Sequence, residues 1–208
     1  MIVVTGLMRS GTSPISMMLN AMGVPMGTYM RMPTANRHAH CEWEDVSFTE
    51  PLYAKLIGAD GHLPAFFHDY IKRRSIPAPW GVKSPFALPF IGLLADACKG
   101  LGESLTVIVS TREYADTIKS LEANAAHLPQ HIRRSVVKRA IGVQERLFEC
   151  IDGIPIDTVH LFPMVETVSN PEGTAARLAG IVGIEELDTY RMFSPPDRRS
   201  IHVFGVEE

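Results

Sequence analysis

The sequence predicts a three-layer α/β domain in which a mostly parallel sheet is flanked by helices. Apolar, β-branched runs alternate with helical segments, a pattern typical of parallel sheets with right-handed crossovers. The run Leu105–Val109 is apolar enough to be a strand buried on both faces. A chain of 208 residues without internal repeats or linkers fits a single domain, 1–208.

The first elements form a strand, a glycine-containing loop and a helix. Residues 2–5 are apolar and β-branched, and an apolar-rich stretch over 14–22 ends at Gly23. The following segment, to about Ala39, lacks periodicity and is predicted to be an irregular loop of the kind that borders active sites. Helices are expected next over 44–57 and 64–74.

The second part of the chain continues the alternation. Residues 80–83 form a short extended run stopped by Ser84, and Pro85 is expected to begin a helix over 85–99. The strand Leu105–Val109 leads into a helix to about Ala126. The remaining elements are a helix from Pro129 to about Ile151, a strand from Ile156 to Leu161, and a helix from Pro171 to Val182 closed by Gly183.

Composition narrows the class of function. Twenty basic and 23 acidic residues give a formal net charge of −3, without the basic excess typical of nucleic-acid-binding proteins. The cysteines, Cys41, Cys98 and Cys150, have neither disulfide nor zinc-site spacing, so we expect a cytoplasmic setting and no metal. Because the sequence lacks a leader-like segment and any run of roughly 18 apolar residues, neither secretion nor a membrane anchor is expected.

Residues 6–13, Gly-Leu-Met-Arg-Ser-Gly-Thr-Ser, have the length and position of a phosphate-binding P-loop. Glycines let backbone N–H groups approach phosphate oxygens, and the helix N-terminus adds a favourable dipole. Thr12 stands where nucleotide kinases and GTPases carry a lysine. The cation is instead Arg9, which would hold a terminal anion while Thr12 and Ser13 donate from their hydroxyls. This departure from the kinase pattern disfavours ordinary phosphoryl transfer. The alternative to an anion-binding loop is a simple turn at the strand end, with Arg9 exposed to solvent.

A second anion-binding candidate follows the strand Leu105–Val109. Arg112 and Ser120 are eight residues apart. If a helix begins at Arg112, this is about 2.2 turns, so both side chains would lie near one face and grip one phosphate. A solvated helix face is the alternative. Because ligands of open α/β sheets bind at the carboxyl ends of the strands, the nearby glycine loop favours the phosphate interpretation.

Four motifs in this order resemble the sulfotransferase family that uses 3′-phosphoadenosine 5′-phosphosulfate (PAPS). They are Arg-Ser-Gly-Thr-Ser (9–13), Trp-Gly-Val-Lys-Ser-Pro-Phe-Ala-Leu (80–88), Arg112 with Ser120, and the late segment 160–183. Arg9 in place of a lysine and the run 83–88 look more like the tyrosylprotein and bacterial-type branches than the cytosolic steroid and phenol enzymes. The resemblance covers most of the chain and implies a P-loop NTPase-like sulfotransferase fold.

Sulfuryl transfer makes definite demands on such a site. A neutral SO₃-like unit passes between two oxygens, so catalysis needs in-line positioning, cations on the leaving phosphate and a base on the acceptor, with no metal required. The resemblance implies that Arg112 and Ser120 contact the 3′-phosphate of PAPS. It also implies contacts with the phosphosulfate by Arg9, Ser10, Gly11, Thr12 and Ser13.

Further cations receive roles from the same resemblance. Lys83 would neutralise charge on the bridging oxygen or the sulfuryl group, with a surface lysine at a strand end as the alternative. Arg198 and Arg199 would close over the nucleotide, although adjacent arginines in a tail are more often solvated. Phe162-Pro163 departs from the family, in which related proteins often carry Tyr-Glu at this point.

The general base is the least determined residue. The tyrosylprotein branch has a catalytic glutamate in the region around Gly27, where this chain continues with Thr-Tyr-Met. Glu44 resembles a glutamate of bacterial-type members and is the preferred base, although an acidic residue also suits the start of a helix. The other candidates for the base are Glu42, His38, His40 and His62.

The acceptor is expected to be a hydroxyl (or amine) on a small molecule or an exposed group, bound by variable loops over 24–43 and 58–80. The family's core elements nearly fill the chain, so we expect a small or exposed acceptor site or one completed in a homodimer. The alternatives are a kinase-like P-loop enzyme and a nucleotide-binding protein without transferase activity. The cluster Arg133, Arg134, Lys138 and Arg139 is expected to be an exposed helix face, with docking of an acidic acceptor as the minority interpretation.

Overall fold

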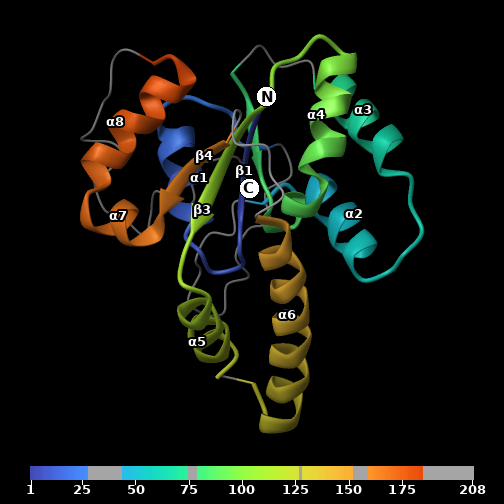
Figure 1. The fold of residues 1–208 in the computed structure, drawn as a ribbon, viewed down its shortest axis with the longest axis vertical. Helices are drawn as coiled ribbons and strands as arrows, with labels where there is room; N and C mark the ends of the chain where they lie inside the picture. The colour runs from blue at the N-terminus through green and yellow to red at the C-terminus, as the bar shows by residue number, and fades with distance from the viewer. Residues whose placement is uncertain (28–43, 75–78, 127, 152–158, 185–208) are drawn as a thin grey trace, which may run out of the picture.

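A four-stranded parallel sheet forms the centre of the computed structural model, which describes residues 1–27, 44–74, 79–126, 128–151 and 159–184 (Figure 1). The strand order is β2-β1-β3-β4, and Ile2 lies opposite both Gly81 and Thr106. The predicted layered α/β architecture is confirmed. The strands are Ile2–Gly6 (β1), Gly81–Lys83 (β2), Thr106–Thr111 (β3) and Val159–Pro163 (β4).

Successive side chains of each strand point to opposite faces of the sheet, so a separate hydrophobic core lies on each face. Ile2, Val4 and Ile108 pack on one face, whereas Val3 and Val107 pack on the other. The first face is covered by α1 (Thr12–Ala21) and α8 (Pro171–Val182). The second is covered by α2 (Val46–Leu56), α3 (Leu63–Arg73), the 3₁₀-helix η1 (Pro85–Phe90) and α4 (Ile91–Gly100), with a contribution from α6 (Gln130–Ile151).

Two helices extend beyond the carboxyl end of β3, at the bottom of Figure 1. They are α5 (Tyr114–Asn124) and α6, which pack against each other. Val143 and Leu147 in the second half of α6 are buried in the core, whereas most residues before Ala140 are exposed. The loop that follows β1 lies at this same end of the sheet, so α5 and α6 are placed beside the predicted ligand site.

Several expected elements differ from the structure, among them the strand expected from Ile156 to Leu161, which is Val159–Pro163 within the described residues. The single helix over 85–99 is wrong, because its first part is the 3₁₀-helix η1; Pro89 lacks a backbone N–H and restricts the residue before it. The helix after β3 begins at Tyr114 rather than Arg112. A short helix that was not expected, α7 (Met164–Ser169), follows β4. Among the residues described, no helix has the length and apolar character needed to cross a membrane.

Asp45 fixes the start of α2. Its buried carboxylate accepts hydrogen bonds from the backbone N–H groups of Ser47 (3.0 Å) and Phe48 (3.3 Å), which caps the helix. It also accepts from the Tyr70 hydroxyl at 3.1 Å and pairs with Arg74 at 2.5 Å. Burial raises the pKa of Tyr70 above its ordinary range, so the phenol remains a hydrogen-bond donor. The backbone next to Glu44 is therefore anchored to α3.

The turn at the end of β1 requires a glycine. Gly6 has a φ of +143°, and a Cβ at this position would lie 2.2 Å from the Ser110 carbonyl oxygen. Substitution by alanine would therefore strain the backbone and force β1 and β3 apart.

We expect Gly6→Ala to lower the free energy of unfolding by about 2–5 kcal/mol, the sum of backbone strain and overpacking. Gly58→Ala is the matched control, because Gly58 also has a positive φ, +95°, but no atom lies within 4 Å of its added Cβ. The control substitution should lower the free energy of unfolding by only about 1–2 kcal/mol. Urea unfolding measures both, and equal losses would contradict the collision with Ser110.

Candidate functional site

The loop between β1 and α1 has the backbone form of an anion cradle. Arg9 (φ +67°) and Gly11 (φ +98°) both adopt positive φ. Positive φ is uncommon for a residue other than glycine, and such strained residues cluster at functional sites. Helix α1 begins at Thr12, and the first N–H groups of a helix have no partner within it. The loop therefore presents a helix N-terminus, with its positive dipole end, at the carboxyl edge of the sheet.

Two residues from other elements hold this loop. The Ser110 hydroxyl on β3 donates to the Ser10 carbonyl oxygen at 2.6 Å. The side-chain amide of Gln144 on α6 accepts from the Met8 N–H at 2.9 Å and donates to the Met8 carbonyl oxygen at 3.1 Å. Gln144 is fully buried, so both bonds are shielded from water. Because Met8 directly precedes Arg9, α6 fixes the backbone that carries the loop cation.

Sequence reasoning missed Gln144 and Ser110. Gln144 is 136 residues from Met8, and nothing in its local sequence names this partner. The one available signal is a polar residue on the helix stripe that also carries Val143 and Leu147, both of which are buried. A polar residue on such a stripe needs a partner, which marks a buried hydrogen bond without identifying it.

Ser10 lies within the loop. Its N–H donates to the Leu7 carbonyl oxygen at 3.1 Å, and its hydroxyl is buried next to Gly6, 2.9 Å from where a Cβ would stand. This hydroxyl has no hydrogen-bond partner among the residues that the structure describes. The expected contact of Ser10 with a phosphosulfate stays a prediction, and its observed bonds stabilise the turn.

Arg9, Ser120 and Arg112 form one hydrogen-bonded cluster. Arg9 Nε donates to Ser120 Oγ at 3.1 Å, and Arg112 Nη1 donates to the Arg9 carbonyl oxygen at 3.1 Å. The expected helix face shared by Arg112 and Ser120 is wrong, because Arg112 precedes α5. Arg9 contacts Ser120 instead. One guanidinium is thus carried by the loop itself, and a second is hydrogen-bonded to the loop backbone.

A second cluster joins β2, α1 and the start of α2. Lys83 Nζ lies 3.0 Å from Glu44 Oε1 and 3.3 Å from Ser13 Oγ. The Lys83 and Glu44 side chains are 4% and 15% exposed, so the pair is largely removed from water. Lys83 is therefore no surface lysine. The structure places the proposed cation and the preferred base side by side, next to the first turn of the helix that the loop opens.

The remaining candidates divide into two groups. His62 Nδ1 accepts from the Ala65 N–H at 3.2 Å and caps α3, a structural use of the side chain. Phe162 is buried, and the guanidinium of Arg177 lies 4.3 Å from its ring centroid. Five candidates lie outside the described residues: His38, His40, Glu42, Arg198 and Arg199.

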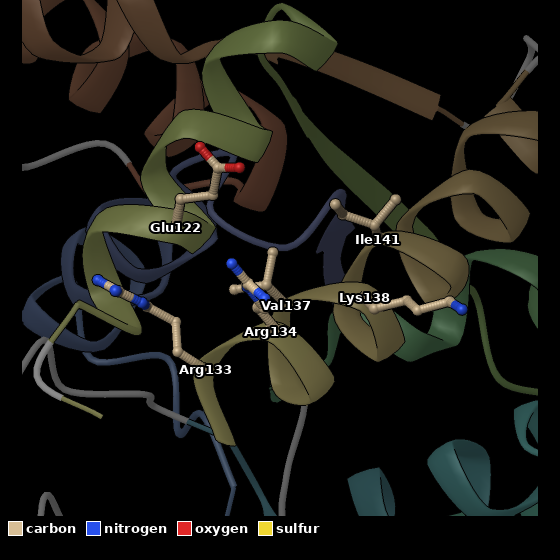
Figure 2. A pocket seen from close by; sticks show the side chains of 6 residues that line it. All are labelled: Glu122, Arg133, Arg134, Val137, Lys138 and Ile141. Atoms are coloured by element: carbon tan, nitrogen blue, oxygen red, sulfur yellow. The ribbon is translucent and has the colours of Figure 1, made fainter. Parts of the chain in front are cut away.

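Helix α6 carries the predicted basic cluster. Arg134, Lys138 and Arg139 are exposed, as expected, and Arg133 is half-buried. A cavity of about 500 Å³ lies between α5 and α6. In Figure 2, the Arg133 and Arg134 side chains extend toward α5, whereas Lys138 points away from Glu122. In the part of the chain that the structure describes, no three His, Cys, Asp or Glu side chains lie close enough to hold a metal ion.

The sequence matches no protein-family model and no curated protein. Solved structures do match. The sulfotransferase STF9 of Mycobacterium avium has 15% sequence identity and a TM-score of 0.57, over 92% of this chain and 66% of that chain. The sulfotransferase STF1 of Mycobacterium tuberculosis H37Rv has 15% identity and a TM-score of 0.52, over 93% and 70% of the two chains.

A third match is the sulfotransferase domain from the curacin biosynthetic pathway, with 10% identity and a TM-score of 0.52 over 93% of this chain and 77% of that domain. The chain thus spans about two thirds of the length of STF9 and covers more of the other two. All three are sulfotransferases that share its arrangement of strands and helices. The fold of this chain is therefore the sulfotransferase fold.

Proposed function

We propose that the protein is a sulfotransferase that moves a sulfuryl group from PAPS to an acceptor hydroxyl or amine. The observation that carries the proposal is the Lys83–Glu44 pair beside Ser13. It supplies a cation and a carboxylate at the end of a phosphate loop that lacks the lysine of nucleotide kinases. The sulfotransferase fold supports the same chemistry, and the scattered cysteines support a cytoplasmic setting.

The two clusters suit the two anionic ends of PAPS. PAPS supplies an activated sulfuryl group on a 5′-phosphate and carries a separate 3′-phosphate. The first turn of α1, with the hydroxyls of Thr12 and Ser13, offers hydrogen-bond donors for the 5′ end. The Arg9–Ser120–Arg112 cluster offers two guanidinium groups for the 3′-phosphate. The guanidinium groups of Arg9 and Arg112 and the helix N-terminus at Thr12 all suit an anionic ligand.

Lys83 stabilises negative charge at the leaving oxygen. Its ammonium is buried, so its interaction with a developing charge is stronger than it would be in water. The hydrogen bond to Ser13 keeps Nζ at the end of the loop. Removal of one preorganised donor of this kind commonly lowers kcat by about 10²–10³-fold.

Glu44 accepts the proton of the acceptor hydroxyl as the general base. A positioned carboxylate in this role contributes about 10²–10⁴-fold. Asp45 is fully buried and bonded to Arg74 and Tyr70, so it anchors the backbone and leaves the proton transfer to its neighbour. The ion pair with Lys83 holds the carboxylate beside the cation that stabilises the leaving group.

Nucleotide binding tests the proposal directly. We expect adenosine 3′,5′-bisphosphate (PAP) to bind in calorimetry, and Arg112→Ala to weaken it by about 10–100-fold, because a charge-assisted hydrogen bond is lost. Arg73→Ala is the control, since this exposed arginine bonds only to the Asp69 carbonyl oxygen of its own helix among the contacts found in the described chain. Magnesium-dependent ATP turnover without PAP binding would refute the proposal.

Sulfate transfer from PAPS should depend on Glu44 more strongly than PAP binding does. Glu44→Gln keeps a hydrogen-bonding group beside Lys83 but removes the base, so we expect sulfate transfer from PAPS to fall by about 10²–10⁴-fold. PAP affinity should change little. Glu50→Gln, an exposed substitution on α2, controls for the loss of a negative charge. PAP binding without transfer by the wild-type protein to any of a broad set of hydroxyl and amine acceptors would instead indicate a binding protein.

Gln144 should affect PAP binding indirectly, by holding the loop after β1 in place. Gln144→Leu leaves the Met8 N–H without its buried acceptor, so we expect a loss of about 1–3 kcal/mol of stability and weaker PAP binding. Gln130→Leu, at the exposed start of α6, is the control. Thermal unfolding with and without PAP measures both effects. Unchanged stabilisation by PAP in Gln144→Leu would show that α6 does not position the loop.

A further inference from the structure

A second cavity lies directly against the P-loop, between α2 and α6. Its volume is about 340 Å³, within the range of small-molecule sites. By contrast, the larger cavity in Figure 2 is lined by residues of α5 and α6 and by none of the loop. The residues that line the smaller cavity are Met8 of the loop, Tyr53 of α2, and Ser135, Val136, Arg139, Ala140 and Val143 of α6.

Two residues that line the smaller cavity are neighbours, in the chain or by contact, of parts of the proposed reaction site. Met8 is the residue before Arg9 in the loop. The Tyr53 ring packs 5.0 Å from that of Phe86, which follows Lys83 by three positions. Tyr53 is seven residues beyond Val46, the start of α2, a helical rise of about 10 Å from the end next to Glu44. A ligand of about this length that lies along α2 would reach from the cavity to the Lys83–Glu44 pair.

The lining suits a ligand with an aromatic body and a negative charge. Met8 and Tyr53 offer a thioether and a ring, both of which contact aromatic groups favourably. Val136, Ala140 and Val143 add apolar surface. Of the lining residues, Arg139 alone is charged, and within the described part of the chain it forms no ion pair. A guanidinium in this position suits a carboxylate, which it binds through two parallel hydrogen bonds.

We propose that this cavity binds the acceptor, and that the acceptor is a small hydroxyaryl carboxylate whose carboxylate pairs with Arg139 while its hydroxyl reaches Glu44. The inference rests on the proposed sulfuryl transfer. The acceptor oxygen forms a bond to sulfur as the bond between sulfur and the bridging oxygen of PAPS breaks. Glu44 takes the hydroxyl proton, and the bridging oxygen leaves with the bonding electrons as the phosphate of PAP, hydrogen-bonded to Lys83.

Binding to the cavity is measurable without any turnover. The probes are 4-hydroxyphenyl carboxylic acids with zero to three carbons between ring and carboxylate, each compared with its methyl ester. In protein with ¹³C-labelled methionine methyl groups, at least one acid should shift the Met8 signal, which Met8→Leu identifies by its loss. We expect Arg139→Ala to weaken that acid by about 10–100-fold, and to leave the weaker ester unchanged, because only the acid pairs with the guanidinium.

Arg134→Ala is the matched control, since this exposed arginine lies on the same helix but lines the other cavity (Figure 2). It should change neither probe. The acid that binds should also be sulfated from PAPS with a higher kcat/KM than its ester, and Arg139→Ala should remove this preference.

The outcomes separate the two hypotheses. If PAP binds but none of the acids shifts the Met8 signal, or if Arg139→Ala and Arg134→Ala behave alike, the acceptor assignment is wrong and the sulfotransferase proposal stands. If the acids bind with the expected dependence on Arg139 but PAP does not bind, the cavity is a ligand site and the sulfotransferase proposal is wrong. Equal affinity for acid and ester would overturn the role of Arg139.

Discussion

The hydrogen bonds that hold the loop at the end of β1 are the constraint on which the site depends. Ser110 fixes the loop from β3, and Gln144 fixes it from α6. With its backbone held at both points, Arg9 is kept at positive φ, where its side chain meets Ser120. Strain in one residue is thus maintained by elements that are distant in sequence, as expected where a backbone must be preorganised for a ligand.

The Lys83–Glu44 pair adds a different kind of constraint. Taking both charges out of water has a large desolvation cost, which their attraction and the bond to Ser13 offset only in good geometry. A buried ion pair of this kind is therefore weak evidence that the pair stabilises the fold, and a functional role explains it better. Asp45 and its partners Tyr70 and Arg74 carry the structural task at the same helix start. Under the proposed function, the neighbouring carboxylates Glu44 and Asp45 would have separate roles, decided by burial and by hydrogen-bond partners.

Most of the fold was predictable, because it depends on local patterns. The strand Leu105–Val109 and the Pro171–Val182 helix, closed at Gly183, follow from apolar periodicity and terminal signals, and both are found. The segment after Pro85 was mistaken for an α-helix because its apolar residues do not distinguish a 3₁₀ turn from an α turn. Arg9 and Lys83 are candidates from the sequence because one follows and the other ends a strand, and ligands of parallel sheets bind at the carboxyl ends of the strands.

The site was predictable as a set of residues but not as a set of contacts. Arg112 and Ser120 were paired by helical spacing, yet Arg9 lies between them because α5 starts two residues after Arg112. The contact of Gln144 with the loop is not predictable from the sequence, because its partners are the backbone N–H and carbonyl of Met8, which every residue except proline has. The acceptor-binding loops expected over 24–43 and 58–80 stay a prediction, because residues 28–43 and 75–78 lie outside the described residues.

The two hydrogen bonds between Gln144 and Met8 have a consequence for the coupling between two bound ligands. Helix α6 cannot shift along its axis without moving the loop, since the same amide holds both the N–H and the carbonyl of Met8. A ligand that orders α6 from the cavity would therefore also order the nucleotide loop. By thermodynamic linkage, a nucleotide bound at the loop would raise the affinity of the cavity for its ligand by the same factor as that ligand raises the affinity for the nucleotide.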